Sequence, residues 1–419
     1  MRAVRRWVRP TGLWTHPDFV RLWGAATVST FGSLVTRTAL PFAAILTLDA
    51  SAFDLALLAV AELVPGFAGG LVAGAWVDRL PRRPILIGAD LGRAVLLATI
   101  PTAALLGVLT LGHLLVVAAL GSVLTVAFDV AYLSYLPSLV RREELIEGNS
   151  KLTAAGAVAE AAAFGSGGWL VQWLTAPVAI LLDAASFLWS AALVGRIRAP
   201  EPPSAPAIAA PDLRREIADG LRATWADPTL RSLAGANVLL ALGYRITGTV
   251  FLLFVNRELG FGPGVLGVIF AVGGATSLLG AVAVGRVTTV LGVGPAMVLG
   301  LALTAVGQGM IVPATGATLT VVALLVAQQL VADPAATVYD VVQTSVRQAV
   351  TPERLLGRVN ASLRVLETGA MLLGALAGGL LGDRIGLRPT LALGAGTILL
   401  AAVWLALSPV LRLRATPGE

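Results

Sequence analysis

Apolar stretches of about 20 residues, the length of a membrane-spanning helix, recur along the whole chain and leave it few other ways to fold. Charged residues make up only 13% of the sequence, whereas soluble domains contain about 25%. The pattern therefore predicts an all-α integral membrane protein with many spans. The expected spans are residues 20–42, 53–77, 84–107, 113–138, 150–173, 177–195, 230–255, 263–285, 293–312, 317–346, 357–382 and 389–410.

The arginines between these spans predict how the chain is oriented. An even number of spans places both termini on one side, and most of the arginines in the connecting segments fall on that side. The opposite side keeps Arg257, Arg384 and Arg388. Because basic loops stay in the cytoplasm, we expect both termini to be cytoplasmic.

The sequence also lacks the residues that several kinds of chemistry need. It has no cysteine, and Lys151 is its single lysine, so disulfides, thiol catalysis and a phosphate-binding GxxxxGK[ST] loop are excluded. His16 and His113 lie near span ends and do not make a metal site. The arginines are dispersed between spans, which favours a role in topology over nucleic-acid binding. We expect no cofactor, no metal, no nucleotide and no nucleic-acid partner.

The two halves of the chain repeat each other. Many glycines, prolines and polar residues recur at an offset of 211 residues, which predicts two tandem six-helix halves in the same orientation. We expect an N-terminal bundle at 1–195, a cytoplasmic linker at 196–228 and a C-terminal bundle at 229–419. The matched pairs include Pro17 and Pro228, Gly32 and Gly243, Asp129 and Asp340, and Asn149 and Asn360.

The linker contains a Pro/Ala-rich stretch, "RIRAPEPPSAPAIAAP", and then a helical pattern. Asp212 can cap this helix, whose apolar residues Leu213, Ile217, Leu221 and Trp225 recur every four positions. We expect an amphipathic helix that lies on the inner membrane surface.

Residues 74–84, "GAWVDRLPRRP", resemble the loop signature between spans two and three of the major facilitator superfamily. The resemblance covers the whole chain and is greatest to the bacterial branch of macrolide-efflux and enterobactin-export proteins. The segments "PDFVRLWGAATVSTFGSLVTRTALP", "FDVAYLSYLPSLV", "EGNSKL" and "LLDAASFLWSAAL" carry it. It implies twelve transmembrane helices in two pseudo-symmetric six-helix bundles, in a bacterial inner (plasma) membrane.

The resemblance also implies a function. The leading interpretation is a secondary active transporter, not an enzyme, that exports a small organic molecule in exchange for protons. The alternatives are an importer or uniporter of the same fold, or a membrane receptor or scaffold that transports nothing. The substrate is not readable: several embedded acids favour a cationic or neutral amphiphile, whereas Arg37 and Arg245 would tolerate an acidic one.

For the loop itself, the resemblance implies a cytoplasmic gate. Asp78 would lie against the amino end of span eleven, and Arg82 would reach an acid at the inner end of span four. This chain has Ser138 where relatives often carry that acid, so Asp90 or Glu143 could substitute. The alternative is that the arginines only fix topology. The residues assigned to this gate are Gly74, Asp78, Arg79, Arg82, Arg83, Asp90 and Arg93.

Charges within the spans mark the expected pathway, because a charge inside the bilayer usually faces a partner or a water-filled cavity. By resemblance, spans one, four, seven and ten line the cavity. Polar residues form a stripe on one face of two of these spans. Span ten presents Gln329, Asp333, Asp340, Gln343 and Arg347, and span four presents Ser122, Thr125, Asp129 and Tyr132. A buried structural ion pair is the alternative to a pathway for protons or substrate.

Further charges lie at similar depths in neighbouring spans. Glu160 is at the depth of Asp129, and Glu367 at that of Asp340, where Arg364 is available to neutralise one member of the second pair. Two neighbouring buried carboxylates are a typical proton carrier. Two other expectations complete the set: an ion pair between Arg37 and Glu62 with Arg245 on the same face, and a structural role for Asp183.

Overall fold

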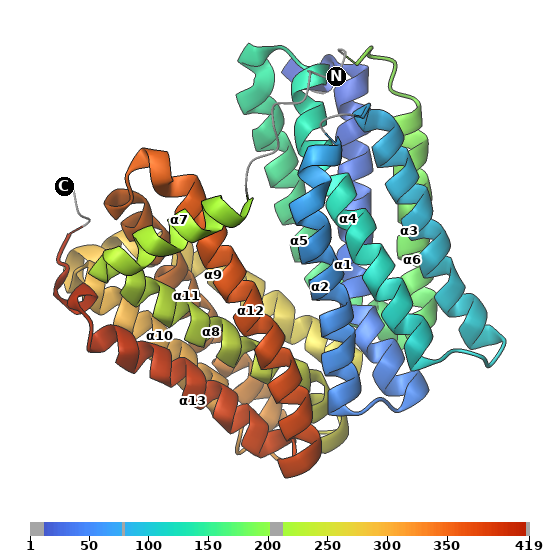
Figure 1. Cartoon of the computed structure of the whole chain (residues 1–419). Helices are drawn as coiled ribbons and strands as arrows, with labels where there is room; N and C mark the ends of the chain where they lie inside the picture. The colour runs from blue at the N-terminus through green and yellow to red at the C-terminus, as the bar shows by residue number, and fades with distance from the viewer. Residues whose placement is uncertain (1–11, 78–79, 202–212, 416–419) are drawn as a thin grey trace, which may run out of the picture. The chain divides into compact units, whose positions relative to one another are not determined.

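In the part of the chain that the structure describes, twelve long α-helices and one shorter α-helix form the fold. The computed structural model describes residues 12–77, 80–201 and 213–415, and these residues form no strand (Figure 1). The first six long helices are α1 (Pro17–Leu48), α2 (Ala52–Val77), α3 (Arg82–Leu105), α4 (Leu111–Leu139), α5 (Leu145–Leu174) and α6 (Ala176–Gly195). The second six are α8 (Pro228–Leu253), α9 (Pro263–Leu291), α10 (Val293–Met310), α11 (Leu319–Val350), α12 (Glu353–Ile385) and α13 (Leu387–Ala406). The short helix α7 (Leu213–Ala226) lies between the two sets.

The helices confirm the all-α membrane fold that the sequence predicts. Among the described residues, eleven helices are long and apolar enough to cross a membrane. The remaining long helix, α5, has 30 residues and contains Glu160. Several helices extend beyond the expected spans, for example α1, which runs from residue 17 to 48 against an expected span of 20–42.

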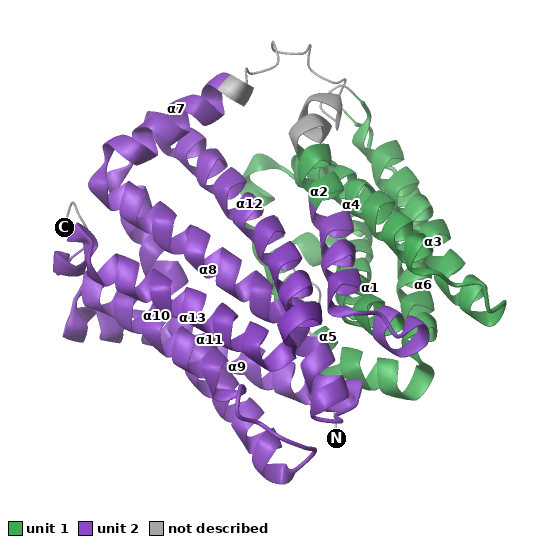
Figure 2. Ribbon diagram, turned by 60° about the horizontal axis from the view of Figure 1, so that its bottom comes forward, with its two compact units in different colours: residues 1–43, 64–210 green, residues 44–63, 211–419 purple. Residues whose placement is uncertain are grey.

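Two compact units divide the chain (Figure 2). Unit 1 consists of residues 1–43 and 64–210, and unit 2 of residues 44–63 and 211–419. The hairpin that joins α1 to α2 therefore belongs to unit 2, although most of both helices belongs to unit 1.

The repeat in the sequence is a repeat in the structure. Helices α1, α2, α3 and α6 begin 211 residues before α8, α9, α10 and α13. The same helix crossing recurs within each half: a Cβ on Gly32 would overlap Asp183 and Ser186, and one on Gly243 would lie 2.8 Å from the Gly394 oxygen. Since Asp183 and Gly394 are themselves 211 apart, the two crossings are equivalent, and the two six-helix halves are pseudo-symmetric.

The apolar cores of the two halves also use matched positions. The first core packs α1, α3, α4 and α6, and the second packs α8, α10, α11 and α13. The matched core pairs include Leu22 and Leu233, Leu86 and Met297, Phe128 and Tyr339, Tyr135 and Val346, and Val194 and Leu405.

Tight turns show where the two halves have diverged. Gly260 and Gly386 adopt positive φ angles of 75° and 92°, which glycine does without steric cost. Their counterparts in the first half are Asp49 at 51° and Thr175 at 75°. Thr175 has a ψ of 156°, in a region that is otherwise almost exclusive to glycine. The first half thus keeps the turn geometry with a strained side chain.

The predicted amphipathic helix is present as α7, and it packs against α12 within unit 2 (Figure 1). Gly220 permits the close approach, because a Cβ there would overlap Ser362 and the Arg358 carbonyl oxygen. Trp225, which the sequence placed on the apolar face, is exposed. Gly220, which was not part of the predicted stripe, therefore lies at the contact with α12, and the proposed cap, Asp212, lies outside the described residues.

The hairpin at 44–63 is held to the rest of unit 2 by Asp383 at the end of α12. Its carboxylate accepts hydrogen bonds from Ser51 Oγ (2.9 Å), Ala52 N (2.9 Å) and Phe53 N (3.2 Å), and so caps the amino end of α2. Arg257 donates to the Ala50 carbonyl oxygen and pairs with Asp49 over 2.5 Å.

Candidate functional site

A cavity of about 440 Å³ lies within unit 2, among α8, α11 and α12. Apolar and aromatic side chains form part of its wall, and charged groups from all three helices form the rest. Its polar lining consists of Asn237, Tyr244 and Arg245 on α8, Tyr339, Asp340, Gln343, Thr344 and Arg347 on α11, and Glu367 on α12.

Asn237 is the centre of a hydrogen-bond network along this cavity. Its side-chain nitrogen donates to Glu367 Oε1 over 2.9 Å and to Gln343 Oε1 over 3.3 Å. Its side-chain oxygen accepts the Tyr339 hydroxyl over 2.6 Å. Both donor hydrogens and the oxygen of this amide are therefore in use, which fixes its orientation.

Gln343 extends the network to the second carboxylate. Its side-chain nitrogen donates to Asp340 Oδ1 over 3.1 Å and to the Thr344 hydroxyl over 3.0 Å. A continuous path of hydrogen bonds thus joins Glu367 to Asp340 through Asn237 and Gln343. Asp340 is exposed and Glu367 is half-buried, so both carboxylates can be reached from the cavity.

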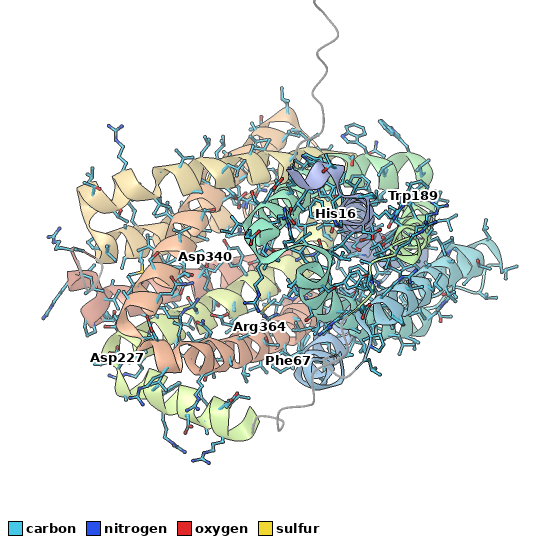
Figure 3. The ribbon with its side chains drawn as sticks, turned by 90° about the horizontal axis from the view of Figure 1, so that it is seen from above. His16, Phe67, Trp189, Asp227, Asp340 and Arg364 are labelled. Carbon is cyan, nitrogen blue, oxygen red and sulfur yellow. The ribbon has the colours of Figure 1, made fainter. Side chains whose placement is uncertain are left out.

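The charges of the lining balance. Asp340 and Glu367 carry the negative charges, and Arg245 and Arg347 carry the positive ones. Arg364 on α12, which is labelled in Figure 3, also acts on Glu367, as the sequence suggested. The Arg364 side chain itself is exposed.

The predicted stripe on span ten is only partly a cavity lining. Asp340, Gln343 and Arg347 line the cavity, whereas Gln329 and Asp333 pack against α9. Gln329 donates to the Ile269 carbonyl oxygen over 3.3 Å, and a Cβ on Gly273 would overlap both Gln329 and Asp333. Asp333 therefore sits at a helix contact that a glycine permits.

Unit 1 contains a different polar cluster, centred on Arg93. This guanidinium pairs with Asp90 over 2.6 Å, with side-chain exposures of 5% and 0%. It also stacks on two rings, 4.5 Å from the Phe128 centroid and 4.0 Å from the Phe187 centroid. Asp183 on α6 is likewise buried and accepts a hydrogen bond of 3.0 Å from Ser186.

This cluster corrects one expectation. Asp90 and Arg93 were assigned to the cytoplasmic gate, but they lie well inside α3 and bind each other, so Asp90 cannot serve as the partner of Arg82. The pairing of Asp129 with Glu160 by depth stays a prediction, because both side chains are exposed, and Arg93 is a charge that acts on Asp129.

Arg82 and Arg83 of the predicted gate motif bind Glu201, which was not predicted as a site residue. The backbone nitrogens of Arg82 and Arg83 donate to the Glu201 carboxylate over 2.7 and 2.6 Å, which caps α3. The Arg83 side chain donates to the Val194 carbonyl oxygen over 3.2 Å and to that of Gly195, at the end of α6.

The remaining predicted residues stay predictions. Gly74 lies in α2, and Asp78 and Arg79 lie outside the described residues. Arg37 on α1 belongs to unit 1 and Glu62 on α2 to unit 2, and both side chains are exposed.

Two buried residues of the unit 2 network, Asn237 and Tyr339, were not predicted as site residues. The only available signal was a single amide in the apolar segment "AGANVLLALG" and a tyrosine beside Asp340.

Comparison with known proteins finds a matching family model and similar sequences. A model of the transmembrane secretion effectors matches residues 12–417. The multidrug efflux pump Tap of Mycolicibacterium fortuitum is 28% identical over 395 residues, which cover 90% of this chain and 93% of that protein. The MFS-type transporter y4rN of Sinorhizobium fredii (strain NBRC 101917 / NGR234) is 28% identical over 279 residues. That match covers 65% of this chain and 66% of the transporter's length.

Solved structures share the fold. The nucleoside transporter NupG gives a TM-score of 0.74 at 14% identity, with 93% of this chain and 98% of that chain covered. A bacterial homologue of the iron transporter ferroportin gives 0.74 at 17% identity, with 94% and 98% covered. At these identities the likeness is one of fold.

Proposed function

Since this chain belongs to the transmembrane secretion effector family of the major facilitator superfamily, we propose that it exports a small organic molecule in exchange for protons. It is a multi-pass membrane transporter of the MFS type. The direction, the coupling ion and the substrate class are the proposal. Its location in the bacterial inner membrane and the cytoplasmic position of both termini are also part of the proposal.

The observation that carries this proposal is the network joining Glu367 to Asp340. A carboxylate can bind a proton or a cationic group of a substrate, and the two compete for the same charge. Asn237 and Gln343 link the two carboxylates, so occupation of one alters the hydrogen bonds available to the other. Competition of this kind is the basis of exchange, because substrate leaves the site as the proton enters it.

The lining supports a substrate class. Tyr244, Leu240 and Met371 offer apolar and aromatic contact, and the two carboxylates offer sites for a cation. Arg245 and Arg347 balance those acids, so a substrate with one positive charge or none suits the cavity better than a strongly charged one. A neutral or singly cationic amphiphile is the expected cargo, and the 28% identity to the multidrug efflux pump Tap supports export of drug-like molecules.

Export can be tested in cells. A bacterial strain that lacks its own efflux pumps should accumulate less ethidium when it expresses this chain, and a protonophore should restore the accumulation. A panel of other cationic and neutral amphiphiles, read as growth inhibition, extends the test beyond one dye. Greater accumulation of these compounds on expression would support an importer instead, and no change with any compound would favour a receptor or scaffold.

A further inference from the structure

Three carboxyl groups surround a single arginine inside unit 1. Arg93 on α3 faces Asp90 on its own helix, Asp129 on α4 and Asp183 on α6. The hydroxyl groups that face these acids are Ser186 and Ser190 on α6 and Thr36 on α1. The cavity of unit 2 shares none of these residues.

The charges of this cluster do not balance when all its acids are ionised. Asp90 is 0% exposed and Asp183 is 1% exposed, so two buried carboxylates would share one guanidinium. Asp129 would add a further negative charge from the exposed side. An uncompensated buried charge is strongly unfavourable, and a group in that situation becomes neutral by binding a proton.

The hydrogen bonds of the cluster are also incomplete. Within the described residues, Asp90 Oδ2 and Arg93 Nε are buried and make no hydrogen bond of normal geometry, although the Ser190 hydroxyl faces Asp90. Buried polar atoms nearly always have such a bond, so each such atom calls for an explanation. A carboxylate oxygen that is not well hydrogen-bonded is a position where a proton can bind.

Arg93 is held too firmly to solve the imbalance by moving. Its guanidinium stacks on the rings of Phe128 and Phe187 and pairs with Asp90. On the other side of Asp183, α1 approaches so closely at Gly32 that a Cβ would overlap the carboxylate. The charge balance of the cluster must therefore change by protons rather than by movement of the arginine.

We propose that Asp90, Arg93 and Asp183 form a buried proton-binding site in unit 1, with Asp129 as its exposed exchange group. One proton from the aqueous phase reaches the site at Asp129, binds a carboxylate oxygen of Asp90 or Asp183, and leaves by the same route. The net charge of the cluster then depends on what Asp129 binds. When Asp129 binds a proton or a cation, its own negative charge no longer competes for Arg93. The positive charge of Arg93 then stabilises the ionised forms of Asp90 and Asp183, and the proton stored on one of them is released.

Infrared spectroscopy detects this proton without any transport. The full chain, purified in lipid nanodiscs and labelled with ¹³C at the aspartate carboxyl, should show the carbonyl band of a protonated aspartic acid near neutral pH. We expect Asp183→Asn to abolish that band and Asp90→Asn to abolish or shift it. Asp227→Asn, at the cap of α8 in unit 2, is the matched control and should keep the band, because asparagine also caps a helix. A band unchanged in both Asp90→Asn and Asp183→Asn would overturn the proposal.

A second variant covers the case in which Asp183→Asn does not fold. Asp183→Glu keeps a titratable group at the same place, and the label can then be moved from aspartate to glutamate. We expect part of the protonated-acid band to move with the glutamate label, whereas a band that stays wholly with aspartate would contradict a role for this position. The infrared band reports the bound proton and not transport. The proposed proton site can therefore be disproved while the export proposal is confirmed, and export can be disproved while the proton site is confirmed.

Discussion

Asn237 on α8 donates a hydrogen bond of 2.9 Å to Glu367 on α12, 130 residues further along the chain. The same amide accepts the hydroxyl of Tyr339 and donates to Gln343, so one small side chain connects three helices at the cavity of unit 2. This relationship makes several properties of the protein testable.

Replacing Asn237 with alanine should impair coupling more than it impairs folding. The change breaks the path of hydrogen bonds between Glu367 and Asp340, whereas α8 keeps its packing against α12 and α13. We expect pH-driven export to fall about tenfold, which corresponds to a coupling free energy of about 1.4 kcal/mol. Asn149→Ala on α5 is the control, because that amide is exposed and donates within its own helix, to the Leu145 carbonyl oxygen. Equal export by both variants would mean that the network is only structural.

The strained turn between α5 and α6 predicts a stabilising substitution. Thr175→Gly should raise the melting temperature of the purified protein, because the φ and ψ angles there cost a non-glycine residue about 1–3 kcal/mol. Gly386→Ala, at the matched position of the second half, should lower it for the same reason. Heating followed by size-exclusion chromatography measures both. Shifts of the same sign in the two variants would contradict the shared turn geometry.

The repeated helix crossing predicts a pair of destabilising substitutions. Gly32→Ala would push against Asp183 and Ser186, and Gly243→Ala against the Gly394 oxygen at 2.8 Å, so both should lower the yield and melting temperature. Gly248→Ala on the same helix as Gly243 is the control, since no described atom lies within 4 Å of a Cβ there. Alanine in this open position should be neutral or slightly stabilising. If all three variants behaved alike, close approach at the crossings would not be what selects glycine.

The cap that Asp383 provides predicts a local effect at the hairpin. Asp383→Ala removes the acceptor for Ser51, Ala52 and Phe53, and the loss of such a cap costs about 0.5–2 kcal/mol. In this cysteine-free chain, a single cysteine at Phe53 should then react faster with a maleimide. Arg384→Ala, an exposed neighbour, should leave the rate unchanged. An unchanged rate in Asp383→Ala would show that the hairpin is held by other contacts.

The sequence was sufficient for the helices and the repeat but not for the site. Long apolar segments determine the spans. Gly32 and Gly243, which lie at the 211-residue offset, occupy the same close helix crossing in the two halves. Asp340 and Glu367 could also be found, because a charge inside an apolar span is conspicuous. Asn237 could not, since a lone amide carries no periodic signal and its partners lie more than 100 residues away.

Asp90 and Arg93 show a different limit of the sequence. They follow closely after the basic loop at 79–83, and their spacing suits a loop motif as well as a buried pair. What separates the two interpretations is which face of α3 is buried, and that depends on Phe128 and Phe187 from α4 and α6. Such partners become known only when the helices are packed.

The most direct test of the account is proton-driven transport by the variants Glu367→Gln and Asp340→Asn. The purified chain in liposomes would receive a pH gradient, and movement of ethidium, or of a better substrate from the cell screen, would be measured beside exchange without a gradient. Glu353→Gln, an exposed position at the start of the same helix α12, is the matched control. The account predicts that both cavity variants lose gradient-driven movement while the control retains it. Full gradient-driven transport by Glu367→Gln, Asp340→Asn and the double variant would contradict it.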